Sequence, residues 1–319
     1  MIKIQNVLKL LFYFLLASTV LASLLAAFGS YNSYLELLTH FQLQYLIASL
    51  FFLVFLLLLK RKRLCLLVCI WILYLLIPLL PYYWPIYQPR PKSEAHSQLK
   101  IMQLNVMFSN LLYAKVLKLI HDEQPDIIGL EEFTQNWATH LKPLEKMYPY
   151  HMLEPDPLPF GLALYSKYPL TNQQIEHSRL ISAYDAPTLL SIAAQINLNH
   201  QPIHLIVTHP FPPLVSDIRN RQLAILGSAR SRYGKNLILL GDLNTSPWSP
   251  YFKRLLQQTG LRDSQQGFGV QPTWPEQYWW MRTPIDHILI SPEIDVIKRY
   301  IGPAIGSDHL PVITVLQLK

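Results

Sequence analysis

The chain has 319 residues, enough for one large domain or two smaller ones, and its formal net charge of +7 is unevenly distributed. Residues 1–89 contain six Lys and Arg against one acidic residue. This leaves 21 Lys and Arg against 19 Asp and Glu for the rest of the chain, a balance that argues against a broad nucleic-acid-binding surface there. The only two cysteines, Cys65 and Cys69, lie in an apolar segment, which excludes a disulfide framework and a thiolate metal site.

Three apolar runs lie in the N-terminal part of the chain. The first, residues 7–28, has Lys9 as its single charged residue and is long enough to cross a hydrocarbon core about 30 Å thick as a helix. Residues 43–59 form a shorter run, and residues 64–80 lead into the aromatic sequence PYYW, which suits a membrane–water boundary. Each of the two shorter runs alone is compatible with a buried helix of a soluble protein. Because three runs follow one another closely, we predict that residues 1–84 are a membrane anchor with about three transmembrane helices in contact with the lipid bilayer.

The loops between these runs predict the orientation. The sequence KRKR at 60–63 separates the second run from the third, whereas residues 29–42 contain no Lys or Arg. Cytoplasmic loops are enriched in Lys and Arg, so residues 29–42 and everything after Trp84 should lie outside, although Arg90 and Lys92 argue weakly the other way. If the first run were a cleaved signal peptide, the C-terminal region would still lie outside. We therefore expect a multi-pass protein of the cytoplasmic (inner) membrane whose C-terminal region faces the extracytoplasmic side.

Residues 85–98 contain three prolines among polar residues and are typical of a linker. The remaining residues, 99–319, contain many short apolar runs and few long helical patterns. Helical spacing covers residues 111–121 and 214–232. Four arginines of the second helix could form a local basic patch, but solvated side chains are the favoured interpretation: Arg219, Arg221, Arg230 and Arg232. The predicted strands are residues 100–106, 127–130, 160–166, 189–198, 203–208, 237–240, 284–290 and 310–318. This order favours an α/β layered sandwich over a strict alternation of strands and helices.

Polar residues recur at the ends of these strands. The clearest case is LILLGDLN at 237–244, where Gly241 breaks an apolar run and Asp242 and Asn244 follow it. Such a pair can orient a water and a phosphate oxygen, and the alternative is a turn that leads into a helix cap. Comparable positions are held by Asn105, Glu132, His209, Asp286, Asp308 and His309. Carboxylate and amide oxygens suit Mg²⁺ or Mn²⁺, and histidines transfer protons. Their recurrence favours one catalytic site on a rigid platform.

With these residues in view, the region from about residue 100 to 319 resembles the endonuclease/exonuclease/phosphatase superfamily, which includes deoxyribonuclease I-like nucleases, inositol-phosphate phosphatases and sphingomyelinases. Each matching stretch is short, but all seven occur in the family's order and spacing. They are LNV at 104–106, PDIIGLEE at 125–132, GLALYSKYP at 161–169, TH at 208–209, GDLN at 241–244, IDHIL at 285–289 and GSDHLP at 306–311. The resemblance implies a four-layer sandwich, two packed β-sheets flanked by helices, over residues 99–319. The three apolar runs make the chain similar to the membrane-anchored bacterial branch.

The resemblance also implies roles for the site residues. Glu132 is expected to be the principal ligand of a Mg²⁺ or Mn²⁺ ion, with Asn105 and Asp308 completing the metal and phosphate pocket. Asp242 would orient or deprotonate the attacking water. His309, held by Asp286, would act on the phosphate, while Asn244 and His209 would contact it and stabilise the transition state. Physically, a metal ion and two histidines can neutralise the charge that grows on a phosphoryl group.

Two positions depart from the family pattern. Met107 stands where many nucleases have a metal-linked acid, which puts a second metal site in doubt. Glu131 stands where glutamine is usual, either adding charge near the metal or capping a strand in solvent.

The leading hypothesis is a metal-dependent phosphodiesterase or phosphatase acting on a phosphate ester, with a lipid-linked substrate favoured. The aromatic stretch 271–281 could form a lip at the site, where Trp274, Trp279 and Trp280 would contact the substrate, or it could pack beneath a loop. The alternatives are a nuclease acting on DNA or RNA, which the near-neutral charge does not favour, and a catalytically inert binding domain, which would not need the full set of site residues.

Overall fold

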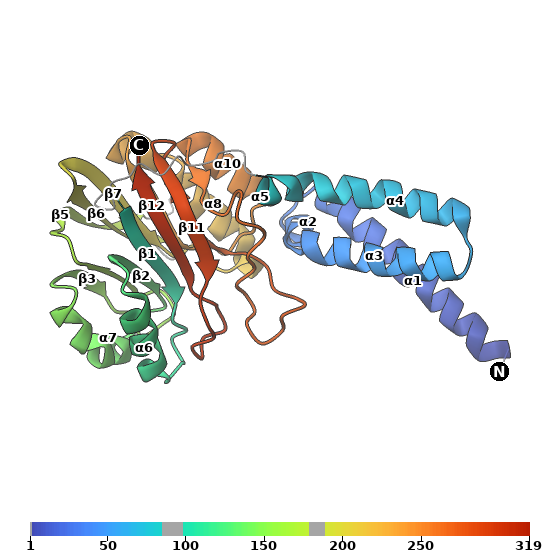
Figure 1. Ribbon diagram of the computed structural model, residues 1–319, viewed down its shortest axis with the longest axis horizontal. Coiled ribbons are helices and arrows are strands. Elements are labelled where there is room, and N and C mark those ends of the chain that lie inside the picture. Colours follow the sequence, from blue (N-terminus) through green and yellow to red (C-terminus); the bar gives the residue numbers. More distant parts are fainter. Residues whose placement is uncertain (1, 85–97, 179–188) are drawn as a thin grey trace.

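The structure, a computed structural model, describes residues 2–84, 98–178 and 189–319. Long N-terminal helices project from one side of a body that contains two β-sheets (Figure 1). The predicted linker, residues 85–98, lies almost entirely outside the described residues, and its last residue already belongs to the first strand.

The N-terminal helices follow the three apolar runs to within a few residues. Three segments are long and apolar enough to cross a membrane: Ile4–Ala26, Ser33–Leu58 and Lys62–Tyr83. The elements are α1 (Ile2–Ala26), α2 (Ser33–Leu37), η1 (Leu38–Phe41), α3 (Gln42–Leu58), α4 (Lys62–Leu76), η2 (Ile77–Leu79) and α5 (Leu80–Tyr83).

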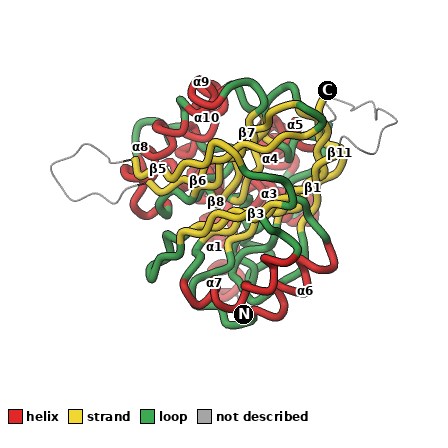
Figure 2. The backbone as a smooth tube through the Cα atoms, turned by 90° about the vertical axis from the view of Figure 1, so that its left-hand side faces the viewer, coloured by secondary structure: helices red, strands yellow, loops and turns green. Residues whose placement is uncertain are grey.

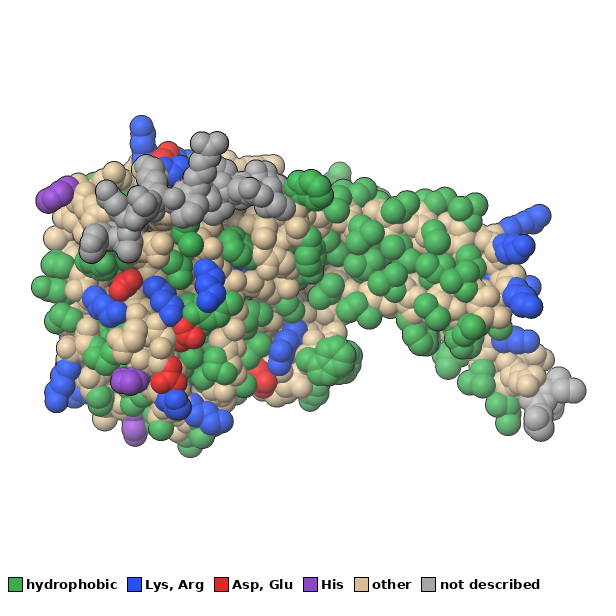
Figure 3. All heavy atoms as spheres, viewed as in Figure 1, with side chains coloured by type: hydrophobic (Ala, Val, Ile, Leu, Met, Phe, Trp, Pro, Cys, Tyr) green, Lys and Arg blue, Asp and Glu red, His purple; other side chains and the backbone are tan. Residues whose placement is uncertain are grey.

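The tetrabasic sequence and the sheets lie at opposite ends of these helices. The turn between α3 and α4 is at the tip farthest from the sheets, and the N-terminus is at the same end (Figure 1). Hydrophobic side chains cover much of the visible surface of the helices, and Lys and Arg side chains gather at the tip (Figure 3). The loop at 29–42 is at the other end, beside the sheets.

Each sheet has six strands. The first has the order β11-β12-β1-β2-β4-β3 and the second β5-β6-β7-β8-β10-β9, with parallel pairing only between β1 and β2 and between β7 and β8 in the part of the chain that the structure describes. The strands are β1 (Gln98–Asn105), β2 (Ile127–Glu131), β3 (Tyr150–Glu154), β4 (Leu162–Ser166), β5 (Thr171–Ser178), β6 (Leu189–Leu198), β7 (Gln201–Thr208), β8 (Leu237–Asp242), β9 (Arg262–Asp263), β10 (Asp286–Ile290), β11 (Ile294–Ile301) and β12 (Val312–Leu318).

The sheets pack face to face and helices cover their outer faces (Figure 2). One apolar core lies between the sheets, where side chains such as Ile101 and Leu240 meet. A second core joins the first sheet to α6 (Tyr113–Glu123) and α7 (Gln135–Leu141). A third joins the second sheet to α8 (Ser216–Leu226) and α10 (Pro250–Thr259). The predicted four-layer sandwich is therefore confirmed.

Two local predictions need correction. The helix predicted over 214–232 is interrupted, because α8 ends at Leu226 and α9 (Ala229–Tyr233) follows Gly227 and Ser228. Gly241 does not end its strand but lies within β8. A Cβ atom at this position would come 1.9 Å from the backbone oxygen of Thr208, so glycine permits the close approach of β7.

Strands β3, β5, β9 and β11 were not predicted. They have no long apolar run, and each of them lies at an edge of its sheet. The sequence of β5, TNQQIEHS, is almost wholly polar.

Candidate active site

The site begins where the inward faces of four strands change from apolar to polar. Side chains of a strand alternate between its two faces, so in β1 the inward positions are Leu99 and Ile101, followed by Gln103 and Asn105. The same change brings Glu131 to the end of β2, Asp242 to the end of β8 and Asp286 to the start of β10, and all five polar side chains are buried. Because the sheets face each other, these side chains meet in the space between them.

Asn105 links two carboxylates from different sheets. Its Nδ2 donates to Oε1 of Glu132 at 3.0 Å and to Oδ2 of Asp242 at 3.2 Å. Its Oδ1 accepts the Met107 backbone N–H, which fixes the orientation of the amide. Glu132 has a φ of 57°, and its Oε2 accepts the backbone N–H of Phe108. The predicted metal ligands Asn105 and Glu132 therefore lie side by side.

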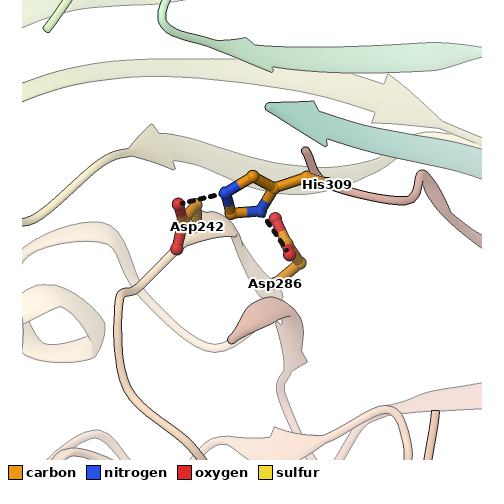
Figure 4. Close-up of side chains that lie close together, drawn as sticks. All are labelled: Asp242, Asp286 and His309. Carbon is orange, nitrogen blue, oxygen red and sulfur yellow. Dashed lines mark hydrogen bonds and ion pairs between the residues drawn. The ribbon is translucent and has the colours of Figure 1, made fainter. Parts of the chain in front are cut away.

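The imidazole of His309 lies between two aspartates (Figure 4). Its Nδ1 is 2.9 Å from Oδ2 of Asp286, and its Nε2 is 3.6 Å from Oδ2 of Asp242. Burial alone would lower the pKa of His309, but the charges of Asp286 and Asp242 raise it to about 10. Burial alone would raise the pKa of Asp242, but the histidine charges and hydrogen bonds lower it to about 2. Both groups are therefore charged at neutral pH, with Asp242 ionised and His309 protonated.

His209 and Asn244 approach Asp242 from another side. Nε2 of His209 is 3.4 Å from Oδ2 of Asp242, and the Nδ2 atom of Asn244 lies 3.1 Å from the same ring nitrogen. Although burial opposes it, the hydrogen bond and charge of Asp242 raise the pKa of His209. Asn244 has a left-handed φ of 51°, and its backbone N–H donates to Oδ1 of Asp242 at 2.9 Å. The turn after β8 therefore directs the side chains of Asp242 and Asn244 toward His209.

Asp308 and Trp274 form the more exposed side of the site. Nε1 of Trp274 donates to Oδ2 of Asp308 at 2.9 Å, and Oδ1 of Asp308 is 4.0 Å from Nε2 of His309. The rings of Trp274 and His309 have centroids 6.4 Å apart. All nine residues predicted for the site thus belong to one connected cluster, and their individual roles remain predictions.

Glu131 does not cap a strand in solvent. It is fully buried and accepts a hydrogen bond from Nε2 of Gln103, which also donates to Asp286. Burial, together with the charges of Asp286 and Asp242, raises the pKa of Glu131 well above its usual value. This environment favours the protonated form of Glu131, which would add no charge near the predicted metal ligands.

Two further residues of the site were not predicted. The Nε2 atom of Gln103 joins Glu131 to Asp286. The hydroxyl of Ser307 donates to the carbonyl oxygen of Asn105 and accepts the backbone N–H of His309. The spacing of two residues between Gln103 and Asn105, which places them on the same face of a strand, is the signal that could have identified the first.

The donor set fits a divalent cation. Four carboxylates gather here, those of Glu132, Asp242, Asp286 and Asp308, and in the described part of the chain no Lys or Arg forms an ion pair with them. Two histidines offset only part of this charge. Asp242, Asp286 and His309 also have possible ligand atoms within 4.8 Å of one another. However, a charged His309 has no lone pair to offer, so oxygen donors at Glu132 suit an ion such as Mg²⁺ better.

Comparisons with known proteins agree with this geometry. The model of the Endonuclease/Exonuclease/phosphatase family matches residues 102–309, more than half of the chain. A comparison with curated proteins finds no match.

Solved structures with the same fold include the human Nocturnin catalytic domain with bound sulfate (20% identity, TM-score 0.58, covering 70% of this chain and 94% of that one). TDP2 from D. rerio in complex with single-strand DNA product shows 16% identity and a TM-score of 0.57, covering 69% of this chain and 99% of the other. An endonuclease/exonuclease/phosphatase from Bacteroides vulgatus shows 18% identity and a TM-score of 0.58, covering 70% and 99%. Enzymes of this family generally use divalent metal ions. The chain therefore belongs to the endonuclease/exonuclease/phosphatase family and is a hydrolase of phosphoester bonds.

Proposed function

We propose that the protein is a Mg²⁺-dependent (or Mn²⁺-dependent) phosphoesterase that hydrolyses a lipid-linked phosphate ester at the extracytoplasmic face of the inner membrane. Residues 1–84 would be the membrane anchor and residues 99–319 the catalytic domain. The observation that carries this proposal is the position of the site, which lies at the end of the sheet domain that contacts the N-terminal helices. Ser246, two residues after Asn244, donates its backbone N–H to the ring of His40, which precedes α3.

The residues suit hydrolysis by an attacking water. Glu132, Asn105 and Asp308 would hold the metal ion, which when bound neutralises phosphoryl charge and polarises a phosphate oxygen. Asp242, ionised and buried, accepts a proton from the water as a general base. His309, charged and held by Asp286, donates a hydrogen bond to a phosphate oxygen. His209 and Asn244 bind the remaining oxygens, so the charge that develops in the transition state meets preorganised donors.

An aromatic rim beside the site supports a substrate in the membrane. The segment after Trp274 contains Tyr278, Trp279 and Trp280, and the last two side chains are 75% and 55% exposed, so they do not pack beneath a loop. Nε2 of Gln44, near the start of α3, donates to the backbone oxygens of Trp280 and Arg282, which places this rim against the helices. Tryptophan side chains favour the headgroup region of a bilayer.

The arrangement of charge supports the proposed orientation. The tetrabasic turn lies at the far end of the helices from the sheet domain (Figure 1), and the positive-inside rule assigns such a turn to the cytoplasm. Helices of 22 or 23 residues rise roughly 33–35 Å, about the thickness of the hydrocarbon core. The sheet domain, packed against the opposite ends, would rest at the extracytoplasmic membrane surface.

A nuclease is the second candidate. It is favoured by one observation, the likeness to TDP2, which was solved with a single-strand DNA product. The near balance of Lys and Arg against Asp and Glu after residue 89 weighs against it, because phosphate backbones are bound mainly through basic side chains.

A turnover screen of the full-length protein in phospholipid vesicles tests the proposal. The substrates are lipid-linked phosphates and diesters in the bilayer, the soluble diester bis(p-nitrophenyl) phosphate, sugar phosphates, and single-strand and duplex DNA. We expect the highest kcat/KM on a lipid-linked ester. The variant W279S/W280S should lower vesicle turnover and leave turnover of the soluble diester unchanged, whereas Y150S, an exposed aromatic on β3, should change neither. Preference for DNA over every lipid ester would overturn the proposal in favour of the nuclease.

A further inference from the structure

The N-terminal helices contribute a buried acid to the support of the active site. Glu36, in α2, is fully buried, and its Oε2 lies 2.5 Å from Nη2 of Arg219 in α8. Arg219 is also fully buried, which corrects the prediction that this side chain is solvated. This ion pair joins the loop between the first two apolar runs to the sheet domain. Glu36 is the single acidic residue among residues 1–89.

Arg219 extends this contact to the catalytic loop, defined here as residues 242–249. Its Nη1 donates to the backbone oxygen of Asn244 at 2.9 Å, and its Nε and Nη2 donate to Oδ1 of Asn220. The peptide unit on the other side of Asn244 is also fixed, because its N–H donates to Asp242. The left-handed backbone conformation of Asn244 is therefore held from both sides.

Two more contacts hold the same loop at alternate residues. The backbone N–H of Ser246 donates to Nδ1 of His40 at 3.2 Å, and Nε1 of Trp248 donates to the backbone oxygen of Pro78 at 3.3 Å. His40 is one turn from Glu36, and its Nε2 lies 3.4 Å from Oε1 of that residue. Residues 244, 246 and 248 are thus each held by the N-terminal helices, the first of them through Arg219.

We propose that Glu36 is a positioning residue of the active site, acting through Arg219 on the backbone of Asn244. A fixed carboxylate orients the planar guanidinium, whose fork then reaches Asn220 and the Asn244 carbonyl together. Without that carboxylate, the guanidinium has no fixed partner on its outer side, and the turn that presents Asp242 and Asn244 loses one of its two restraints. The N-terminal helices thereby hold the catalytic groups in place as well as tethering the domain. That Asp242 and Asn244 are catalytic rests on the proposed function.

Matched variants of the full-length protein test this role. E36Q keeps the shape of the side chain and removes its charge. T39V is the control, because the buried Thr39 lies in the same segment and its hydroxyl donates to the backbone oxygen of Glu36. With bis(p-nitrophenyl) phosphate and Mg²⁺, we expect E36Q to lower kcat by about 10²-fold with KM nearly unchanged, as for a small displacement of catalytic groups. We expect T39V to keep the kcat of the wild type at temperatures where thermal unfolding shows both variants folded.

Hydrogen exchange followed by mass spectrometry gives a readout that does not depend on turnover. E36Q should speed exchange in the peptide covering residues 242–249 and leave exchange in β1 and β12 unchanged, whereas T39V should change neither. If E36Q does not fold, R219K serves in its place, because a lysine keeps the charge beside Glu36 but lacks the fork that reaches Asn244. Wild-type kcat and wild-type exchange in E36Q, or in R219K where E36Q does not fold, would overturn the proposal. Faster exchange without any turnover in the wild type would instead count against the proposed function.

Discussion

Asp242 and His309 show how two buried side chains acquire their reactivity from each other. Desolvation disfavours the charge on each, yet the pair is stable as an ion pair because Asp286 and His209 add opposite charges nearby. The result is a carboxylate that can accept a proton beside an imidazolium that can donate a hydrogen bond. The two predictions for single residues therefore test the charges of Asp242, Asp286 and His309 and not the shapes of their side chains.

The first prediction concerns the general base. D242N keeps the shape of the side chain but cannot accept a proton from water, so hydrolysis of bis(p-nitrophenyl) phosphate should fall by about 10²-fold or more. The exposed Asp122 provides the control, since D122N should retain full turnover with the same thermal unfolding midpoint. Equal turnover of D242N and the wild type would show that Asp242 is not the base.

The second prediction concerns His309 and pH. Its pKa is raised to about 10 in the folded protein, against about 6.5 unfolded, so its contribution to stability is fully present below pH 6.5 and is lost as pH rises toward 10. D286N removes the nearest charge that raises this pKa. The difference in the free energy of unfolding between the wild type and D286N, measured with chelator present, should be largest below pH 6.5 and shrink toward pH 10. A difference independent of pH would contradict the assigned pairing.

At the scale of elements, the site results from strands whose inward faces end in polar residues. Ile101, Gln103 and Asn105 occupy alternate positions of β1, and Leu240 and Asp242 do the same in β8. The apolar core between the sheets is closely packed, and it therefore fixes the positions of the polar residues at the ends of these strands.

The third prediction follows from two neighbouring residues at the end of β2. Glu132 is partly exposed and bonded to Asn105, whereas Glu131 is fully buried, which raises its pKa and favours its protonated form. E132Q should raise the Mg²⁺ concentration needed for half-maximal activity by at least about 10-fold, since it replaces the proposed principal anionic ligand. E131Q replaces an acid whose burial favours its neutral form with a neutral amide and should leave Mg²⁺ activation unchanged. Chelation should abolish turnover, and added Mg²⁺ should restore it. Equal Mg²⁺ dependence of both variants would place the metal elsewhere.

The same alternation explains what the sequence could predict. Apolar runs with a polar residue at the end identified most central strands and the site residues, because local spacing alone determines which face a side chain occupies. The edge strand β5 has no such run, so its sequence gives no signal. The pairing of Glu36 with Arg219 joins residues 183 positions apart, and neither neighbourhood indicates a partner. Arg219 was therefore predicted to be solvated, although the fold buries it.

At the scale of the whole molecule, the sheet domain contacts the ends of its own helices directly. The backbone N–H groups of Gly267 and Gly269 donate to the carbonyl oxygens of Pro81 and Tyr82, in addition to the contacts of the catalytic loop. With the helices in the membrane as proposed, this packing would determine the distance of the site from the bilayer.

The fourth prediction concerns topology. With the tetrabasic turn in the cytoplasm, protease added to cells with an opened outer envelope should digest the sheet domain while a cytoplasmic marker protein stays intact. Epitope tags at the two termini report on which side of the membrane each terminus lies. The N-terminal tag should be protected from the protease. Protection of the C-terminal tag until the inner membrane is broken would place the domain in the cytoplasm and strengthen the nuclease candidate.

On the proposed topology, the contact between Glu36 and Arg219 would form only after the sheet domain has been exported. Glu36 and His40 are synthesised before any strand of the sheets. On the proposed topology they reach the extracytoplasmic face of the inner membrane with the first helices. The turn at Asn244 acquires its last restraint only after the exported domain has folded and docked onto them. A sheet domain that has not yet packed against the helices would then hydrolyse phosphate esters poorly. Full activity would appear only at the membrane surface where the helices are inserted.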